Sequence, residues 1–129
     1  MTALSALHAS AGLVLLLAHA LFFVRALEMR RRGGTPGPVD RVARTLSHWG
    51  LPAAVATGAV AAARNPGGAG GTGLGIVHIA LGLMPVVVIL AFAPLLPLKR
   101  RIPWLLPALN LVLFALAAAT GLWLRSRGG

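Results

Sequence analysis

Four histidines are the residues of this sequence best suited to chemistry, and all of them fall inside long apolar stretches. They are His8, His19, His48 and His78. An imidazole placed in hydrocarbon is costly unless it has a partner, so each ring needs a hydrogen-bond acceptor or a metal. For one isolated histidine, a bond to a backbone carbonyl explains the residue as well as ligation does. Four of them in a chain of 129 residues favour a ligand role.

Two of these histidines, His8 and His78, are predicted to lie at the same depth. Each stands just inside the outer end of its apolar stretch and begins the pattern His-x-x-x-Gly-Leu, with its glycine at Gly12 or Gly82. In an up-down four-helix bundle the first and third helices face each other across the core. Two facing imidazoles at one depth suit the axial ligation of a haem iron, and the glycines one turn below leave room for a flat macrocycle. Close helix packing explains such glycines equally well.

The other two histidines, His19 and His48, are both expected nearer the cytoplasmic side. They are predicted on helices that follow each other along the chain. This suits the ligation of a haem between diagonally opposed helices less well. Three roles stay open for this second, weaker site: a second haem, a quinone pocket, or simple bonds to the backbone.

Other kinds of site lack the residues that they need. The two acidic residues, Glu28 and Asp40, lie in or beside the first loop, so no mid-membrane carboxylate is predicted for proton transport or for a nucleophile–histidine–acid set. The absence of cysteine excludes disulfides, iron–sulfur clusters and thiolate metal sites. A zinc site made of histidine alone needs three or four at one depth, whereas these four divide between two depths.

Four apolar stretches are predicted to position the histidines. They cover residues 4–24, 42–63, 74–98 and 102–124, and each is near the roughly 20 residues that a membrane-spanning helix requires. With 57% hydrophobic and 11% charged residues, the composition is far from that of a soluble domain, and the stretches lack the alternation of barrel strands. We therefore predict one all-α integral membrane domain, residues 1–129, folded as a transmembrane four-helix up-down bundle.

The basic residues predict the orientation of this bundle. Most of the twelve lie on the side of the molecule that the first and third connections share, namely Arg25, Arg30, Arg31, Arg32, Arg41, Arg44, Lys99, Arg100 and Arg101. The positive-inside rule places loops 25–41 and 99–101 in the cytoplasm and both termini outside an inner or plasma membrane of bacterial type. Because these charges mark membrane edges, they predict contact with the lipid bilayer and no nucleic-acid partner. The first stretch lacks a basic n-region, so it is expected to be a retained helix and not a signal peptide.

A weak internal repeat accompanies the histidine pattern. The second stretch contains Ala-Thr-Gly ending at Gly58 and closes at Arg64, and the fourth contains Ala-Thr-Gly ending at Gly121 and closes at Arg125. This indicates a 2+2 parallel repeat about an axis along the membrane normal. Chance matches within apolar low-complexity sequence explain it as well.

The layout resembles the cytochrome b561-like proteins, small membrane electron carriers that hold b-type haem between histidines of facing helices. The segments that carry this resemblance are Leu7-His8, Ser47-His48-Trp49, Gly75-Ile76-Val77-His78-Ile79-Ala80-Leu81-Gly82 and Trp104-Leu105-Leu106-Pro107-Ala108-Leu109-Asn110. The resemblance implies a haem b held by His8 and His78. The family's fourth helix also supplies a histidine, but Leu106 stands there, so a second haem would need His19 in its place.

These features predict a b-type haem subunit that passes electrons between a redox partner protein, or fellow subunits, and the quinone pool. The alternative from another class is a structural or accessory membrane subunit without a cofactor. A third interpretation is a membrane enzyme similar to the protoporphyrinogen oxidases, which also carry a histidine and an arginine on the first helix, like His8 and Arg25. The lysine pattern of their third helix is missing from this chain.

Overall fold

The computed structural model of the chain describes residues 3–64, 73–90, 97 and 101–127, which are helical apart from short connections. Four long helices, α1, α2, α3 and α5, make up nearly all of it, and no strand occurs among these residues. The predicted all-α fold class is confirmed to this extent.

Helix α1 runs from Ala3 to Arg32 and is longer than the predicted stretch 4–24. The apolar run ends near Arg25, but good helix formers continue, and three arginines in the last turn face the negative end of the helix dipole favourably. Gly33 ends the helix with a positive φ of 63° and donates its N–H to the Met29 carbonyl at 3.1 Å. This left-handed cap is the conformation in which glycine is preferred.

Helix α2 runs from Pro38 to Arg64 and begins before the predicted residue 42. Proline suits the first helical position because its missing N–H would have had no partner there. The Gly37 carbonyl accepts from the Arg41 N–H at 3.2 Å, and the Asp40 carboxylate accepts from the Gly37 N–H at 2.6 Å. These bonds satisfy the first turn of the helix and fix its start.

Helix α3 runs from Gly73 to Leu90 and helix α5 from Leu105 to Arg127. A turn precedes α5, in which Leu105 N–H donates to the Ile102 carbonyl at 3.1 Å. The end of the predicted stretch 74–98 beyond Leu90, except Pro97, lies outside the described residues, as do Lys99 and Arg100 of the predicted cytoplasmic loop.

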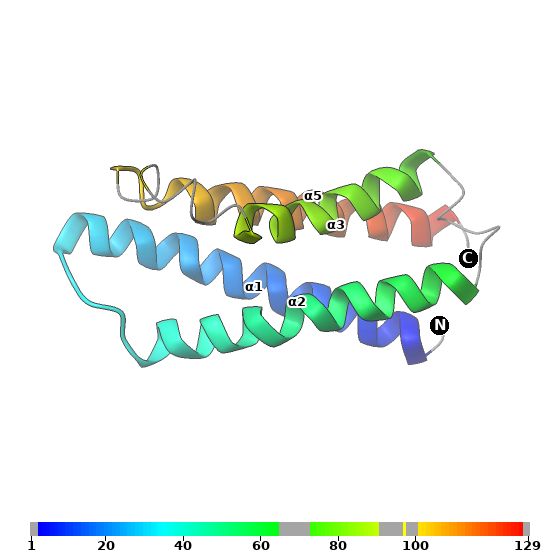
Figure 1. Ribbon diagram of the computed structural model, residues 1–129, viewed down its shortest axis with the longest axis horizontal. Coiled ribbons are helices and arrows are strands. Elements are labelled where there is room, and N and C mark those ends of the chain that lie inside the picture. The colour runs from blue at the N-terminus through cyan, green and yellow to red at the C-terminus, as the bar shows by residue number, and fades with distance from the viewer. Residues whose placement is uncertain (1–2, 65–72, 91–96, 98–100, 128–129) are drawn as a thin grey trace.

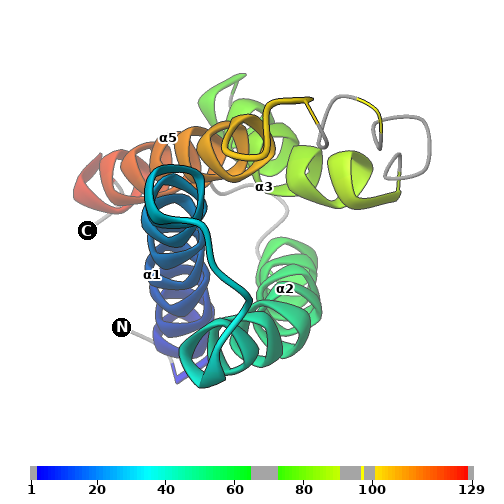
Figure 2. The same cartoon turned by 90° about the vertical axis from the view of Figure 1, so that its left-hand side faces the viewer.

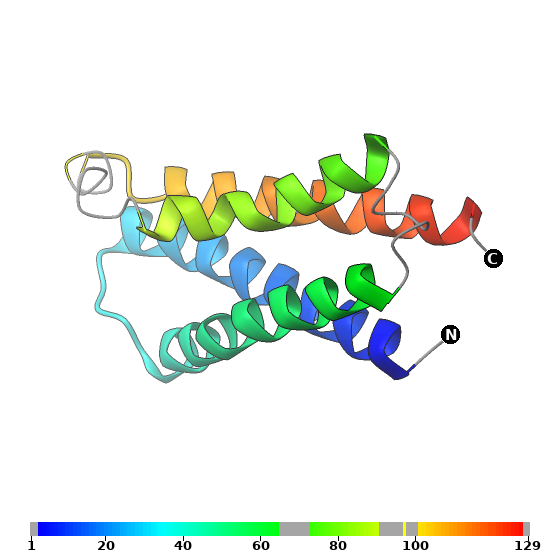
Figure 3. The same cartoon turned by 45° about the vertical axis from the view of Figure 1, so that its right-hand side comes forward.

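Successive helices run in alternating directions, so that α1 begins and α5 ends at the same end of the molecule (Figures 1 and 3). Helix α1 packs against both α2 and α5, and α3 packs against α5, whereas α2 and α3 scarcely touch. In cross-section, α5 therefore lies between α1 and α3 (Figure 2). The close crossing of α1 and α2 depends on Gly50, where an added Cβ would lie 3.2 Å from a methyl carbon of Leu15.

Two of the helices, α1 and α5, are long and apolar enough to cross a membrane. Helix α2 is long enough but is not apolar enough by the same measure. The described apolar part of α3, Gly73–Val88, is shorter than a span. Many large apolar side chains point outward, including Leu17 at 60% and Leu122 at 67% exposure, which is unusual for a protein surface in water.

Candidate functional site

His8 of α1 and His78 of α3 meet inside the molecule although their two helices do not pack closely. The centroids of the two rings are 6.0 Å apart, and the ring planes are nearly perpendicular at 77°. Both residues are half-buried. The two histidines that the sequence predicts at one depth are thus brought together by the fold.

The His8 ring is held by helix α2. Its Nδ1 lies 2.9 Å from the carbonyl oxygen of Ala54 and 3.3 Å from the hydroxyl oxygen of Thr57. Both partners belong to one turn of α2, so the ring bridges the first two helices.

The His78 ring is held in the same manner by helix α5. Its Nδ1 lies 2.8 Å from the carbonyl oxygen of Ala117 and 3.2 Å from the hydroxyl oxygen of Thr120. The contacts of the second helix pair therefore repeat those of the first, atom for atom.

These contacts define which nitrogen of each ring carries the proton. A carbonyl oxygen can only accept, so Nδ1 of His8 and of His78 must be the protonated nitrogen. Every hydrogen bond of the two rings within the described residues is made through Nδ1. In a neutral ring with this tautomer, Nε2 carries the lone pair, which is the form of imidazole that binds metals.

Two glycines contact the rings, and two others stand one turn from the histidines on the same helices. A Cβ added at Gly58 would lie 2.9 Å from Cε1 of His8, and one at Gly121 would lie 3.0 Å from Cε1 of His78. The rings thus occupy space that any other residue would fill. Gly12 and Gly82 differ, because a Cβ at either position would meet no atom within 4 Å.

His19 is enclosed by apolar side chains. It is only 4% exposed, its Nδ1 lies 2.9 Å from the Leu15 carbonyl oxygen, and its ring packs at 4.7 Å from Phe114 of α5 and 5.4 Å from Phe22. A bond to the backbone one turn earlier already satisfies this ring.

His48 is exposed, and its ring lies 5.6 Å from that of the neighbouring Trp49. The described residues contain no contact between the rings of His48 and His19. The structure brings the first predicted pair together and leaves the second pair apart.

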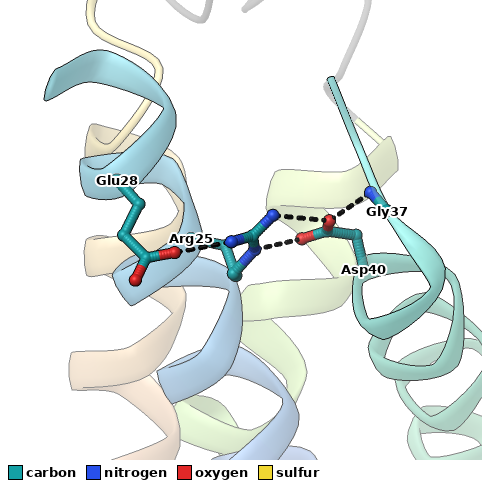
Figure 4. A network of polar contacts seen from close by, with 4 residues as sticks. All are labelled: Arg25, Glu28, Gly37 and Asp40. Carbon is teal, nitrogen blue, oxygen red and sulfur yellow. Dashed lines mark hydrogen bonds and ion pairs between the residues drawn. The ribbon is translucent and has the colours of Figure 1, made fainter. Parts of the chain in front are cut away.

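A polar network joins α1 to α2 at the end of the molecule opposite the histidine pair (Figure 4). Arg25 donates to both carboxylate oxygens of Asp40, at 3.2 and 3.3 Å, and to Glu28 at 2.6 Å. The hydrogen bonds from Arg25 and then from the Gly37 N–H hold the pKa of Asp40 below its ordinary value, and the bond to Asp40 is the main cause that raises the pKa of Arg25. Arg25 is therefore committed to structural contacts in this protein.

The threonines and alanines that hold the two rings were not among the residues expected at the site. The sequence does contain a signal for them, since Ala-x-Ala-Thr-Gly ends at both Gly58 and Gly121. The motif marks the internal repeat, but only the packing of α2 and α5 shows that it contacts the histidines.

The arrangement offers two imidazole nitrogens, the Nε2 atoms of His8 and His78, and the described part of the chain adds no third ligand of this kind. No group of three or more histidine, cysteine or acidic side chains suited to a metal occurs among the described residues. A metal held here would take its remaining ligands from a cofactor or from solvent.

The chain is thus defined as an all-helical protein with a paired-histidine site at one end of its core. No protein-family model, curated protein or solved structure matches it.

Proposed function

We propose that this chain is a b-type haem membrane subunit that transfers electrons between a redox partner and the quinone pool, with His8 and His78 as the axial ligands. The observation that carries the proposal is the contact of two rings that are both bonded through Nδ1. Metal-bound histidines almost always donate their other N–H to a carbonyl or carboxylate, as these two do.

The separation of the rings fits a single metal between them. With metal–nitrogen bonds of about 2 Å, two imidazoles on opposite sides of one metal have their centroids roughly 6 Å apart. The observed distance is 6.0 Å. A flat macrocycle would lie across the line that joins the two nitrogens. The angle between the two ring planes therefore does not decide whether it fits.

Space for the macrocycle is supported by two observations beside the rings. Gly12 and Gly82 face open space, and helices α2 and α3 scarcely touch. A flat group seated between the two imidazoles would extend toward both glycines in this proposal. The four glycines would thus serve two purposes, Gly58 and Gly121 for the rings and the other two for the cofactor.

The membrane topology that we propose has four antiparallel spans. The apolar windows of α1 and α5 are only 17% buried within the protein, so most of their surface needs another apolar environment. The arginines of the α1–α2 connection would lie in the cytoplasm, with the histidine pair near the outer surface. Helices α2 and α3 would complete the bundle.

In this proposal a bound haem supplies reversible one-electron chemistry at iron. His8 and His78 would hold the iron from the chain, which would leave no position for a substrate, and the apolar helices around them would lower the local dielectric. A metal whose protein ligands leave no place for a substrate is suited to electron transfer and not to catalysis.

The test is the visible spectrum of protein purified in detergent. A reduced-minus-oxidised haem b spectrum of low-spin type, unchanged by carbon monoxide, is expected of the wild-type protein. His8→Ala and His78→Ala should each abolish that spectrum. With a single haem, His19→Ala and His48→Ala keep it in full, and a spectrum retained after loss of His8 or His78 would exclude this pair as the ligands.

One observation favours a second candidate, a structural subunit without a cofactor. Each ring of the pair is already satisfied by a backbone carbonyl, which is the ordinary state of a histidine within helices. This alternative predicts colourless protein even after expression with added haem. It also predicts that replacing either histidine lowers the thermal unfolding midpoint and changes no spectrum.

A further inference from the structure

The two threonines beside the histidine pair have the same position in each half of the molecule. Thr57 approaches Nδ1 of His8 at 3.3 Å, and Thr120 approaches Nδ1 of His78 at 3.2 Å. Each stands immediately before the glycine against which the ring rests.

The hydroxyl hydrogens of both threonines are already used within their own helices. The Thr57 hydroxyl donates to the carbonyls of Ala53 at 2.7 Å and Ala54 at 3.2 Å. The Thr120 hydroxyl likewise donates to the carbonyls of Leu116 at 3.0 Å and Ala117 at 2.9 Å. A hydroxyl has a single hydrogen, so the oxygen presents only lone pairs to the imidazole.

Each Nδ1–H is therefore shared between two acceptors, a backbone carbonyl and a threonine oxygen. The carbonyl comes from a helix backbone and is present whatever side chain stands there. The threonine oxygen is the only one of the two acceptors that a point substitution removes, so this residue can control the strength of the bond.

We propose that Thr57 and Thr120 are positioning residues that act through His8 and His78. Together they set how strongly each Nε2 donates electrons to the iron and at what angle each ring is held. This inference rests on the proposed haem function. A second acceptor on Nδ1–H increases the basicity of the imidazole, and a more basic axial ligand stabilises oxidised iron. Loss of either oxygen should thus raise the midpoint potential, and the matching geometry predicts shifts of similar size at the two sites.

The test compares the isosteric variants Thr57→Val and Thr120→Val with Thr57→Ser and Thr120→Ser. Valine keeps the branched shape and removes the oxygen, whereas serine keeps the oxygen. Thr45→Val is the matched control, because the exposed Thr45 bonds in the same way to its own helix, to the Arg41 carbonyl at 3.1 Å, and is on α2 away from both rings of the pair. Midpoint potentials come from redox titration, ring angles from the electron paramagnetic resonance of oxidised protein, and haem affinity from titration of apoprotein.

Both valine variants should raise the midpoint potential, change the low-spin resonance and weaken haem affinity by about 10-fold or more, as loss of such a partner does at other metal sites. The serine variants and Thr45→Val should stay close to wild type. Coloured valine variants with wild-type potential and resonance would overturn this inference and leave the proposed function intact. A colourless wild-type protein would overturn both, and a valine variant that loses its haem but regains it with serine supports the positioning role.

Discussion

At the residue scale, four glycines on the helices of the histidine pair differ in the space beside them. Gly58 and Gly121 have no space for a side chain, because an added Cβ would fall 2.9–3.0 Å from a ring carbon. Gly12 and Gly82 have space, although they stand on the histidine-bearing helices and one turn from the rings. Glycine in a helix costs about 1 kcal/mol relative to alanine, so empty space beside two such residues needs an explanation.

Alanine substitution distinguishes these two kinds of glycine. Gly58→Ala and Gly121→Ala should lower the thermal unfolding midpoint even without haem, since overpacking typically costs roughly 1–3 kcal/mol and here displaces a ring from its carbonyl. Gly12→Ala and Gly82→Ala should leave the apoprotein as stable or slightly more stable. The same two variants should bind haem more weakly, because the new methyl groups would enter the space proposed for the macrocycle. Unchanged haem affinity in both would contradict that placement.

At the element scale, the α1–α2 connection is fixed by polar contacts more than by apolar packing. Gly33 ends α1, Pro38 begins α2, and Arg25 ties the two helices together through the buried Asp40. Asp40 also accepts from the Gly37 N–H, so one carboxylate both caps α2 and anchors it to α1. The start of α2 is therefore sensitive to the charge of a single group.

This arrangement predicts a stability that depends on pH through Asp40. Its pKa is lowered in the folded state, so its contribution is fully present above the unfolded value of about 3.9 and is lost as pH falls through the lower folded value. Asp40→Asn should lower the thermal unfolding midpoint in detergent near neutral pH. The difference from wild type should shrink once the pH falls below about 4. Glu28→Gln is the control and should change the midpoint less, because Glu28 is more exposed and pairs within one helix. A constant difference from pH 3 to pH 7 would show that the charge of Asp40 is not the cause.

Sequence patterns predicted the helical class and the pairing of His8 with His78, because both follow from local periodicity and equal depth. They placed the helix ends less well. Helix α1 continues past Arg25, since a charge ends an apolar run without ending a helix, and only Gly33 stops it. The partners of the rings were missed because Thr57 and Thr120 meet the histidines through packing between helices, which no single stretch of sequence encodes.

At the scale of the whole molecule, the membrane topology that we propose depends on how many helices would cross a bilayer. Helices α1 and α5 are long and apolar enough by themselves, whereas α2 is less apolar and the described apolar part of α3 is short. The histidine pair uses all four helices, since His8 bonds to α2 and His78 to α5. A site built in this way requires α2 and α3 to lie at the same depth as α1 and α5, so the four helices should insert together.

Single cysteines decide between four spans and two, because the chain has no cysteine of its own. Three exposed positions serve as reporters: Thr35 after α1, Ala63 at the end of α2, and Ser126 at the end of α5. With four spans and the proposed orientation, a membrane-impermeant maleimide added to intact cells should label Ala63→Cys and Ser126→Cys but not Thr35→Cys, which should react only after the cells are opened. If only α1 and α5 crossed, Ser126→Cys would still be labelled from outside while Ala63→Cys would be protected. Protection of Ala63→Cys would therefore contradict the four-span bundle, and with it a cofactor site shared by all four helices within the membrane.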